Sequence, residues 1–122
     1  MDFKDFTVLY VEDEGVIRSN VEKCLNYVFN VLVAKDGQEG LELFSNNKVD
    51  LIITDVYMPE KDGITMLSDI KQINPNVPCI VTSAYDPKLF DQSCAFESCD
   101  YISKPFDIKE LLNNCLKSLE VM

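Results

Sequence analysis

Short apolar runs alternate with amphipathic segments along the whole chain. Five runs are rich in β-branched and other apolar residues, and the middle runs are almost unbroken by polar side chains. Such runs are typical of strands that are covered on both faces of a sheet. The expected strands cover residues 7–11, 30–34, 50–54, 78–82 and 100–103.

The segments between these strands repeat apolar residues at helical spacing. The first is expected to bury a face that includes Val16 and Ile17. The fourth begins with a capping acid, Asp86, followed by proline. The last carries the clearest apolar stripe, and Asp107 and Glu110 resemble a capping box at its start. The expected helices span residues 14–27, residues 37–46, a segment around 64–70, a segment from 86, and a segment from 107 to 119.

Strict alternation of strand and helix predicts an α/β fold. We expect a doubly wound five-stranded parallel sheet, in the flavodoxin-like order 2-1-3-4-5, with helices on both faces. The chain has 122 residues, which fits one domain over 1–122. No apolar run reaches the ~18 residues of a membrane span. The N-terminus does not resemble a signal peptide, so a cytoplasmic location is expected.

Charge and cysteine content narrow the function. The net charge is −10, which disfavours binding to nucleic acids and anionic membranes. The chain has five cysteines, no CxxC pair and no histidine, so zinc sites and imidazole catalysis have little support. We therefore expect buried, reduced thiols.

Polar side chains that could bind a ligand or take part in a reaction follow four of the five expected strands. Glu12 and Asp13 follow the first, Asp55 the third, Ser83 the fourth and Lys104 the fifth. Each has an ordinary explanation when taken alone, such as an acid near a helix N-terminus or a solvated loop residue. In an open parallel sheet, however, ligands bind outside the carboxyl ends of the strands. The five residues together therefore indicate one site.

Carboxylates gathered at such a site repel one another unless a hard cation binds, and Mg²⁺ suits the arrangement because it also shares phosphate oxygens. A carboxylate can attack phosphorus to form an aspartyl-phosphate. A metal ion and a lysine would neutralise the charge on the transferred group. Asp55 is the candidate nucleophile, with Lys104 and the hydroxyl of Ser83 as its partners.

Four motifs, "LYVEDE", "DLIITDVYMPEKDG", "IVTSAY" and "YISKPF", give the chain a family resemblance. It resembles a response-regulator receiver domain of two-component signalling, similar to chemotaxis regulators, over essentially its whole length. The resemblance implies that Asp55 accepts a phosphoryl group from a phosphohistidine of a sensor histidine kinase or phosphotransfer protein. It implies that Asp13 and Asp55 bind Mg²⁺ directly, Glu12 through water, and Tyr57 through its backbone carbonyl.

The resemblance also implies a switch. Lys104 would pair with the phosphoryl oxygens, and the Lys104–Pro105 bond would be cis. Ser83 would move toward the phosphoryl group and Tyr101 would turn inward, changing the surface of the fourth helix, fifth strand and fifth helix. A downstream effector protein or output domain would read that surface, which is expected to include Lys88, Leu89, Gln92 and Tyr101. Such a protein is no enzyme beyond its own phosphotransfer and autodephosphorylation.

Two features depart from the family pattern. The segment "CAFESCDY" replaces the usual Gly-Ala pair before the fifth strand, which leaves the end of the fourth helix open. Tyrosines stand two positions after Asp55 and two after Ser83, at Tyr57 and Tyr85. These rings would flank the path of an attacking water, so we predict slow autodephosphorylation.

Alternative functions remain at the level of sequence. A flavin-binding module would need a hydroxyl- and glycine-rich loop after the first strand, where "EDEGVIR" is acidic. A Mg²⁺-dependent phosphatase would normally place an aspartate at the position of Tyr57. A receiver-like scaffold that is never phosphorylated remains the main alternative. The chain suits a stand-alone regulator and equally the receiver of a longer protein, with a slight preference for the first.

Overall fold

The computed structural model describes residues 3–56, 58, 61–83 and 99–119. The fourth expected helix, from Asp86, lies outside the described residues, as do Lys88, Leu89 and Gln92. After a short 3-10 turn, η1 (Phe3–Asp5), strands and helices alternate up to residue 83. The elements are β1 (Thr7–Val11), α1 (Gly15–Asn26), β2 (Asn30–Ala34), α2 (Gly37–Asn46), β3 (Leu51–Asp55), α3 (Gly63–Ile73), β4 (Cys79–Ser83), β5 (Cys99–Ser103) and α4 (Ile108–Leu119).

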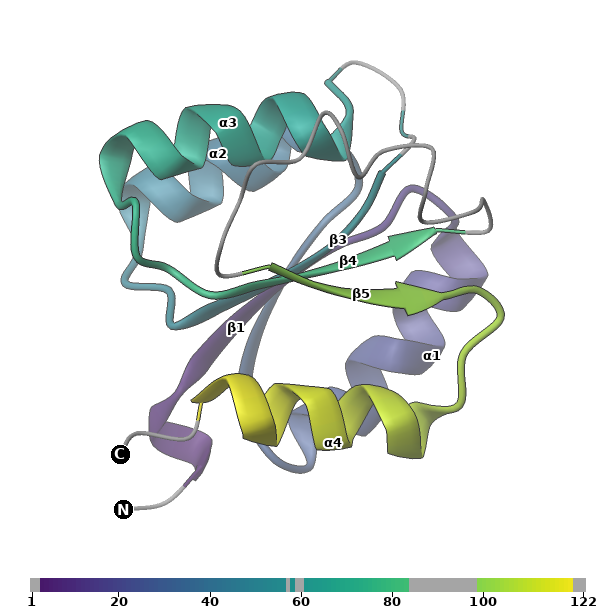
Figure 1. Ribbon diagram of the computed structural model, residues 1–122. Coiled ribbons are helices and arrows are strands. Elements are labelled where there is room, and N and C mark those ends of the chain that lie inside the picture. The colour runs from purple at the N-terminus through teal and green to yellow at the C-terminus, as the bar shows by residue number, and fades with distance from the viewer. Residues whose placement is uncertain (1–2, 57, 59–60, 84–98, 120–122) are drawn as a thin grey trace.

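The five strands form one parallel sheet in the order β2-β1-β3-β4-β5. Helices α2 and α3 cover one face, and α1 and α4 cover the other (Figure 1). This confirms the predicted fold class and strand order. Two predicted strands, 50–54 and 78–82, are each displaced by one residue from the observed β3 and β4.

Alternate residues of the central strands enter two separate apolar cores, as the two-residue period of a strand requires. Leu9 and Val11 of β1 pack with Met66, Leu67 and other residues on the side of α2 and α3. Val8 and Tyr10, the alternate residues of β1, pack on the opposite side with residues of α1 and α4. Burial on both faces explains why these strands read as unbroken apolar runs.

Acidic side chains mark the starts of the helices. Asp36 accepts a hydrogen bond from the backbone N–H of Glu39 at 2.8 Å, and Asp62 accepts one from Thr65 at 2.7 Å. Each bond satisfies a backbone donor that has no partner within the helix. At the start of α4, the carboxylate of Asp107 accepts from the N–H of Lys109 at 3.0 Å.

The expected apolar face of the first helix is only partly buried. Val21 and Leu25 enter the core, but Val16 is 68% exposed and Ile17 is 38% exposed. The prediction that these two residues are buried was therefore wrong. Ile17 lines a cavity of about 430 Å³ that α1 shares with the loop of Lys104, Pro105 and Phe106, so none of the described elements covers it.

The cysteines also depart from expectation. Cys79 of β4 and Cys99 of β5 form a disulfide, so the expectation of reduced thiols was wrong for this pair. They are direct neighbours across the sheet, which the sequence alone does not reveal. Cys24 and Cys115 are free thiols. Cys94 and most of the "CAFESCDY" segment lie outside the described residues.

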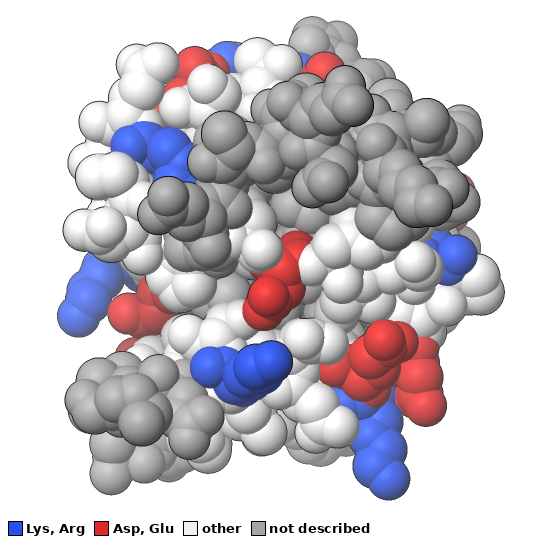
Figure 2. Space-filling model, viewed as in Figure 1, with Lys and Arg blue, Asp and Glu red and all other residues white. Residues whose placement is uncertain are grey.

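Charged side chains on the face viewed in Figure 2 lie in small groups of both signs, separated by uncharged residues. The acidic excess of the chain is therefore not collected into one block among the described residues of that face. No helix in the described part of the chain has both the length and the apolar character needed to cross a membrane.

Candidate functional site

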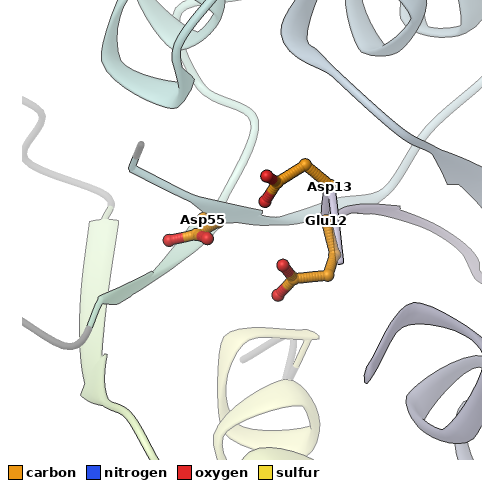
Figure 3. A group of neighbouring side chains, drawn as sticks. All are labelled: Glu12, Asp13 and Asp55. Carbon is orange, nitrogen blue, oxygen red and sulfur yellow. The ribbon is translucent and has the colours of Figure 1, made fainter. Parts of the chain in front are cut away.

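Three carboxylates meet at the carboxyl edge of the sheet. Glu12 and Asp13 follow β1, and Asp55 is the last residue of the neighbouring strand β3 (Figure 3). Each contributes one oxygen to a cluster in which these atoms lie within 4.8 Å of one another. Parallel strands that are hydrogen-bonded neighbours end at the same rim, so two distant acidic motifs become one site.

The ammonium group of Lys104 joins two of these acids. Its Nζ lies 2.7 Å from Oε1 of Glu12 and 3.1 Å from Oδ2 of Asp55. Burial lowers the pKa of Lys104, but the hydrogen bonds with Glu12 and Asp55 outweigh that effect, and the pKa lies above its ordinary value. Lys104 therefore stays charged and offsets part of the acid–acid repulsion.

Glu12 is the most enclosed acid of the cluster, with its side chain 1% exposed. Burial raises its pKa, and the hydrogen bond from Lys104 offsets this only in part. Its second oxygen accepts from the backbone N–H of Glu14 at 3.2 Å. These contacts hold the carboxylate at the rim although its charge is costly to bury.

Asp55 is held in a defined orientation. Its Oδ1 accepts a hydrogen bond from the backbone N–H of Val56 at 2.8 Å, while Oδ2 faces Lys104. The side chain is 13% exposed. One carboxylate oxygen is thus fixed by the backbone and the other by a cation, which leaves the group ordered but reachable from solvent.

Ser83 and Tyr101 lie next to this cluster on β4 and β5. Ser83 is 1% exposed. Its carbonyl oxygen accepts the backbone N–H of Lys104 at 2.7 Å and the hydroxyl of Tyr101 at 3.3 Å. The structure therefore brings together Glu12, Asp13, Asp55, Ser83, Tyr101 and Lys104. Tyr57, the remaining residue predicted for the site, lies outside the described residues, as does Tyr85.

A family model described as "Response regulator receiver domain" matches residues 8–115. The chain belongs to the response-regulator receiver family. The match includes every residue predicted for the site and confirms the resemblance seen in the four motifs. Members of this family are phosphoacceptors of bacterial two-component systems, and they pair with histidine kinases and with effectors or output domains.

Individual relatives agree with this assignment. The transcriptional regulatory protein HptR of Staphylococcus aureus is 35% identical over 111 residues, which are 87% of this chain and 43% of HptR. The chain thus spans less than half the length of this relative. The receiver domain of Francisella response regulator 1452 superposes with a TM-score of 0.84 at 32% identity, covering 93% of this chain and 95% of that one.

A receiver domain from the hybrid histidine kinase CckA is similar to the same degree. It has a TM-score of 0.81 at 32% identity, with 93% of this chain and 99% of that one covered. Receiver domains with this fold therefore occur both in response regulators and within a kinase chain.

The Lys104–Pro105 peptide of this receiver domain is cis, as the resemblance implied. Lys104 follows β5 directly, and Pro105 and Phe106 continue the loop toward α4. The loop forms one wall of the cavity next to α1.

Two further residues support the site, and sequence reasoning did not single them out. Arg18 of α1 donates from its guanidinium to the backbone carbonyl of Glu12 at 2.9 Å. A Cβ atom on Gly63 would lie 2.0 Å from the carbonyl oxygen of Asp55, so only glycine allows α3 to approach β3 this closely. Gly63 is the last residue of the motif "DLIITDVYMPEKDG", and its place there was the only sign of this packing in the sequence.

Tyr10 lies beneath the cluster, two residues before Glu12 on the same face of β1. Its hydroxyl is the one buried side-chain oxygen without a hydrogen-bond partner among the described residues. Burial raises its pKa, and the charges of Glu12 and Asp55 raise it further. The phenol therefore stays protonated and adds no negative charge to the site.

The donor set fits a hard divalent cation. Glu12, Asp13 and Asp55 supply carboxylate oxygens, which Mg²⁺ prefers, and the exposed Asp13 leaves the cluster open to solvent. A cation here would also lower the repulsion that Lys104 balances only in part. These residues could therefore hold Mg²⁺.

Proposed function

We propose that this receiver domain, residues 1–122, is a phosphorylation-activated switch. It takes a phosphoryl group from the phosphohistidine of a sensor histidine kinase or phosphotransfer protein onto Asp55. The observation that carries the proposal is Lys104, whose ammonium contacts both Glu12 and Asp55 at the open rim of the sheet. A cation fixed beside a solvent-reachable carboxylate is the arrangement that in-line phosphoryl transfer needs.

In the transfer step, a carboxylate oxygen of Asp55 attacks the phosphorus, and the phosphorus–nitrogen bond of the donor breaks. The donor imidazole keeps the electron pair of that bond. The backbone N–H of Val56 holds Asp55 in place, and Lys104 balances charge on the phosphoryl oxygens. Mg²⁺ held by Glu12, Asp13, Asp55 and the carbonyl of Tyr57 would supply further positive charge. The domain catalyses only this transfer and its own dephosphorylation.

The signal then leaves through β5 and its neighbours. A phosphoryl group on Asp55 adds acceptor oxygens near Ser83, and the hydrogen bond between Tyr101 and Ser83 couples that residue to β5. The surface of segment 84–98, β5 and α4 would change, and an effector protein or output domain would read it. Lys88, Leu89, Gln92 and Tyr101 remain the proposed contact residues.

The donor protein would dock beside the site. Val16 and Ile17 are exposed apolar side chains on the first turn of α1. Ile17 lines a cavity together with Pro105 and Phe106. Apolar residues next to an open acidic site suit a partner that brings its phosphohistidine to Asp55. We place this exchange in the cytoplasm and assign no nucleic-acid or membrane binding to the domain, given its net charge of −10.

Acetyl phosphate, a small phosphoryl donor, tests the proposal directly. The protein is incubated with this donor and Mg²⁺, and its intact mass is measured beside that of Asp55→Asn. We expect one phosphoryl group on the wild-type protein and none on the variant. Asp69→Asn, at a half-exposed position of α3 outside the acidic cluster, is the matched control and should be phosphorylated normally. An unchanged wild-type mass would favour the alternative of a receiver-like interaction scaffold.

A further inference from the structure

The disulfide between Cys79 and Cys99 joins the first residues of two neighbouring strands. The two residues are paired in the register of β4 and β5, and their Cα atoms are 4.7 Å apart. That separation lies within the range that an unforced disulfide accepts. Strand β5 lies at the edge of the sheet, and β4 is its only neighbouring strand among the described residues.

The positions of the described cysteines explain why Cys79 pairs with Cys99 and not with Cys24 or Cys115. Cys79 is fully buried in the core on the α2 and α3 side, and Cys99 is a partly exposed residue packed against that core. Cys115 lies in the core on the opposite face of the sheet, where burial raises its thiol pKa to about 12. Cys24 is on α1, which covers that opposite face too. Neither can reach Cys79 without crossing the sheet.

We propose that Cys79 and Cys99 form a reversible thiol-oxidation site that fastens the edge strand β5 to β4. In the forward reaction, the thiolate of the more exposed Cys99 attacks a low-molecular-weight disulfide such as oxidised glutathione. The small disulfide bond breaks and one thiol leaves. The thiolate of Cys79 then attacks the sulfur of Cys99 and releases the second thiol, which carries away the remaining electron pair and takes up a proton. Reducing thiols reverse both steps.

The disulfide would restrain the switch residues Ser83 and Tyr101 without changing the phosphoacceptor Asp55. It closes a loop that contains Ser83 and the entire connection from β4 to β5, and Tyr101 lies two residues after Cys99. The acids and Lys104 stand at the carboxyl ends of the strands, whereas the cysteines stand at the amino ends of β4 and β5. Oxidation is therefore expected to hold β5 in the described arrangement. This effect on signalling rests on the proposed function, but the oxidation site itself does not.

Thiol counting tests the site. Reduced protein and protein treated with oxidised glutathione are denatured, and their free thiols are titrated. We expect five thiols before treatment, as the sequence contains, and a loss of two afterwards, with a cross-linked peptide that joins positions 79 and 99. Cys94→Ser is the matched control and should still form the bond, whereas Cys99→Ser should not. Retention of every thiol in the wild-type protein, or a cross-link through Cys94, would overturn the proposal.

Two further measurements test the consequence. The disulfide joins residues that are 20 positions apart. Closing this loop should raise the Tm of the oxidised protein by on the order of 10 °C, and Cys99→Ser should show no such rise. Phosphorylation by acetyl phosphate should reach the same extent in both redox forms. Phosphorylation should also change the hydrogen exchange of residues 99–103. This change should be at least twofold smaller in the oxidised protein than in the reduced protein. An equal change in hydrogen exchange in the two redox forms would overturn the claim that the disulfide restrains β5 during signalling. Phosphorylation of the reduced form alone would contradict the claim that the bond leaves Asp55 unaffected. Failure of both forms to accept phosphate would count against the proposed function and leave the thiol result standing.

Discussion

Tyr101 donates a hydrogen bond from its hydroxyl to the backbone carbonyl oxygen of Ser83, over 3.3 Å. The same oxygen accepts the backbone N–H of Lys104 at 2.7 Å. Three residues to which the proposed mechanism gives separate tasks are thus joined at one atom. A displacement of Ser83 toward a phosphoryl group would therefore change the hydrogen bonds to both β5 and the loop that carries Lys104.

Removing the hydroxyl of Tyr101 should have only a small effect on stability. The carbonyl of Ser83 keeps its shorter bond to Lys104, so we expect Tyr101→Phe to lower the free energy of unfolding by no more than about 1 kcal/mol. Urea denaturation measures this difference. Tyr27→Phe is the control, because Tyr27 is 87% exposed and should show no change. A loss well above that limit would mean that the hydroxyl supports more of the fold than one hydrogen bond.

Lys104→Met should destabilise the protein much more. It leaves the buried carboxylate of Glu12 without its cation, and we expect a loss of about 2–3 kcal/mol at neutral pH without Mg²⁺. The double variant with Glu12→Gln should recover most of that loss. The control is Lys61→Met, which breaks the more exposed pair between Lys61 and Asp69 at 2.6 Å and should cost under about 1 kcal/mol. Equal losses for the two lysines would contradict this account.

Glu12 should make stability depend on pH. Burial raises its folded-state pKa above the ordinary value of 4.5. Above that pH the unfolded chain has lost a proton that the folded protein still holds, so the contribution of Glu12 to stability falls as pH rises through the folded pKa. Glu12→Gln lacks this dependence. In the absence of Mg²⁺, the unfolding free energy of Glu12→Gln should therefore increase relative to that of the wild type as pH rises from 4.5 to 7. Glu42→Gln, at an exposed position of α2, is the control and should show the same pH dependence as the wild type.

Two glycines at equivalent helix starts should respond oppositely to alanine. In Gly63→Ala the new methyl group would lie 2.0 Å from the carbonyl oxygen of Asp55, so we expect a loss of about 1–3 kcal/mol and slower phosphorylation. In Gly15→Ala the nearest atom would be Nη2 of Arg18 at 3.7 Å, and stability should be unchanged or rise by up to about 1 kcal/mol. Thermal unfolding and acetyl phosphate labelling of both variants would measure the difference.

The tyrosine two positions after Asp55 should control how long the phosphorylated form lasts. If the ring of Tyr57 hinders an attacking water, Tyr57→Asn should shorten the half-life of the aspartyl-phosphate several-fold. Decay is followed by intact mass after the phosphoryl donor is removed. Tyr27→Asn, remote from Asp55 in the sequence, should decay like the wild type, and an unchanged rate in Tyr57→Asn would contradict the hypothesis.

The sequence predicted the order of elements well because apolar periodicity records which faces are covered. Strands 7–11 and 30–34 match the observed β1 and β2. The ends of β3 and β4 were displaced by one residue because they depend on pairing across the sheet, where Asp55 lies opposite Thr82. Val16 and Ile17 were misplaced because an apolar helix position is buried only where another element covers it.

The candidate site was predictable for a topological reason. Parallel strands place their carboxyl ends at one rim, so Glu12, Asp13, Asp55 and Lys104 could be grouped from strand ends alone. The support given by Arg18 and Gly63 could not be predicted in that way, since it depends on contacts with the backbone carbonyls of Glu12 and Asp55. The bond between Cys79 and Cys99 likewise depends on strand register over a separation of 20 residues.

The exposed first turn of α1 can vary in sequence independently of the residues at the strand ends. Val16 and Ile17 lie outside the core, and their side chains make none of the polar contacts that hold Asp55 or Lys104. On the proposed docking of the donor at this turn, substitutions there would change which donor docks and leave the acceptor chemistry intact. A designer who wants an orthogonal signalling pair would therefore diversify this turn and leave the strand ends unchanged.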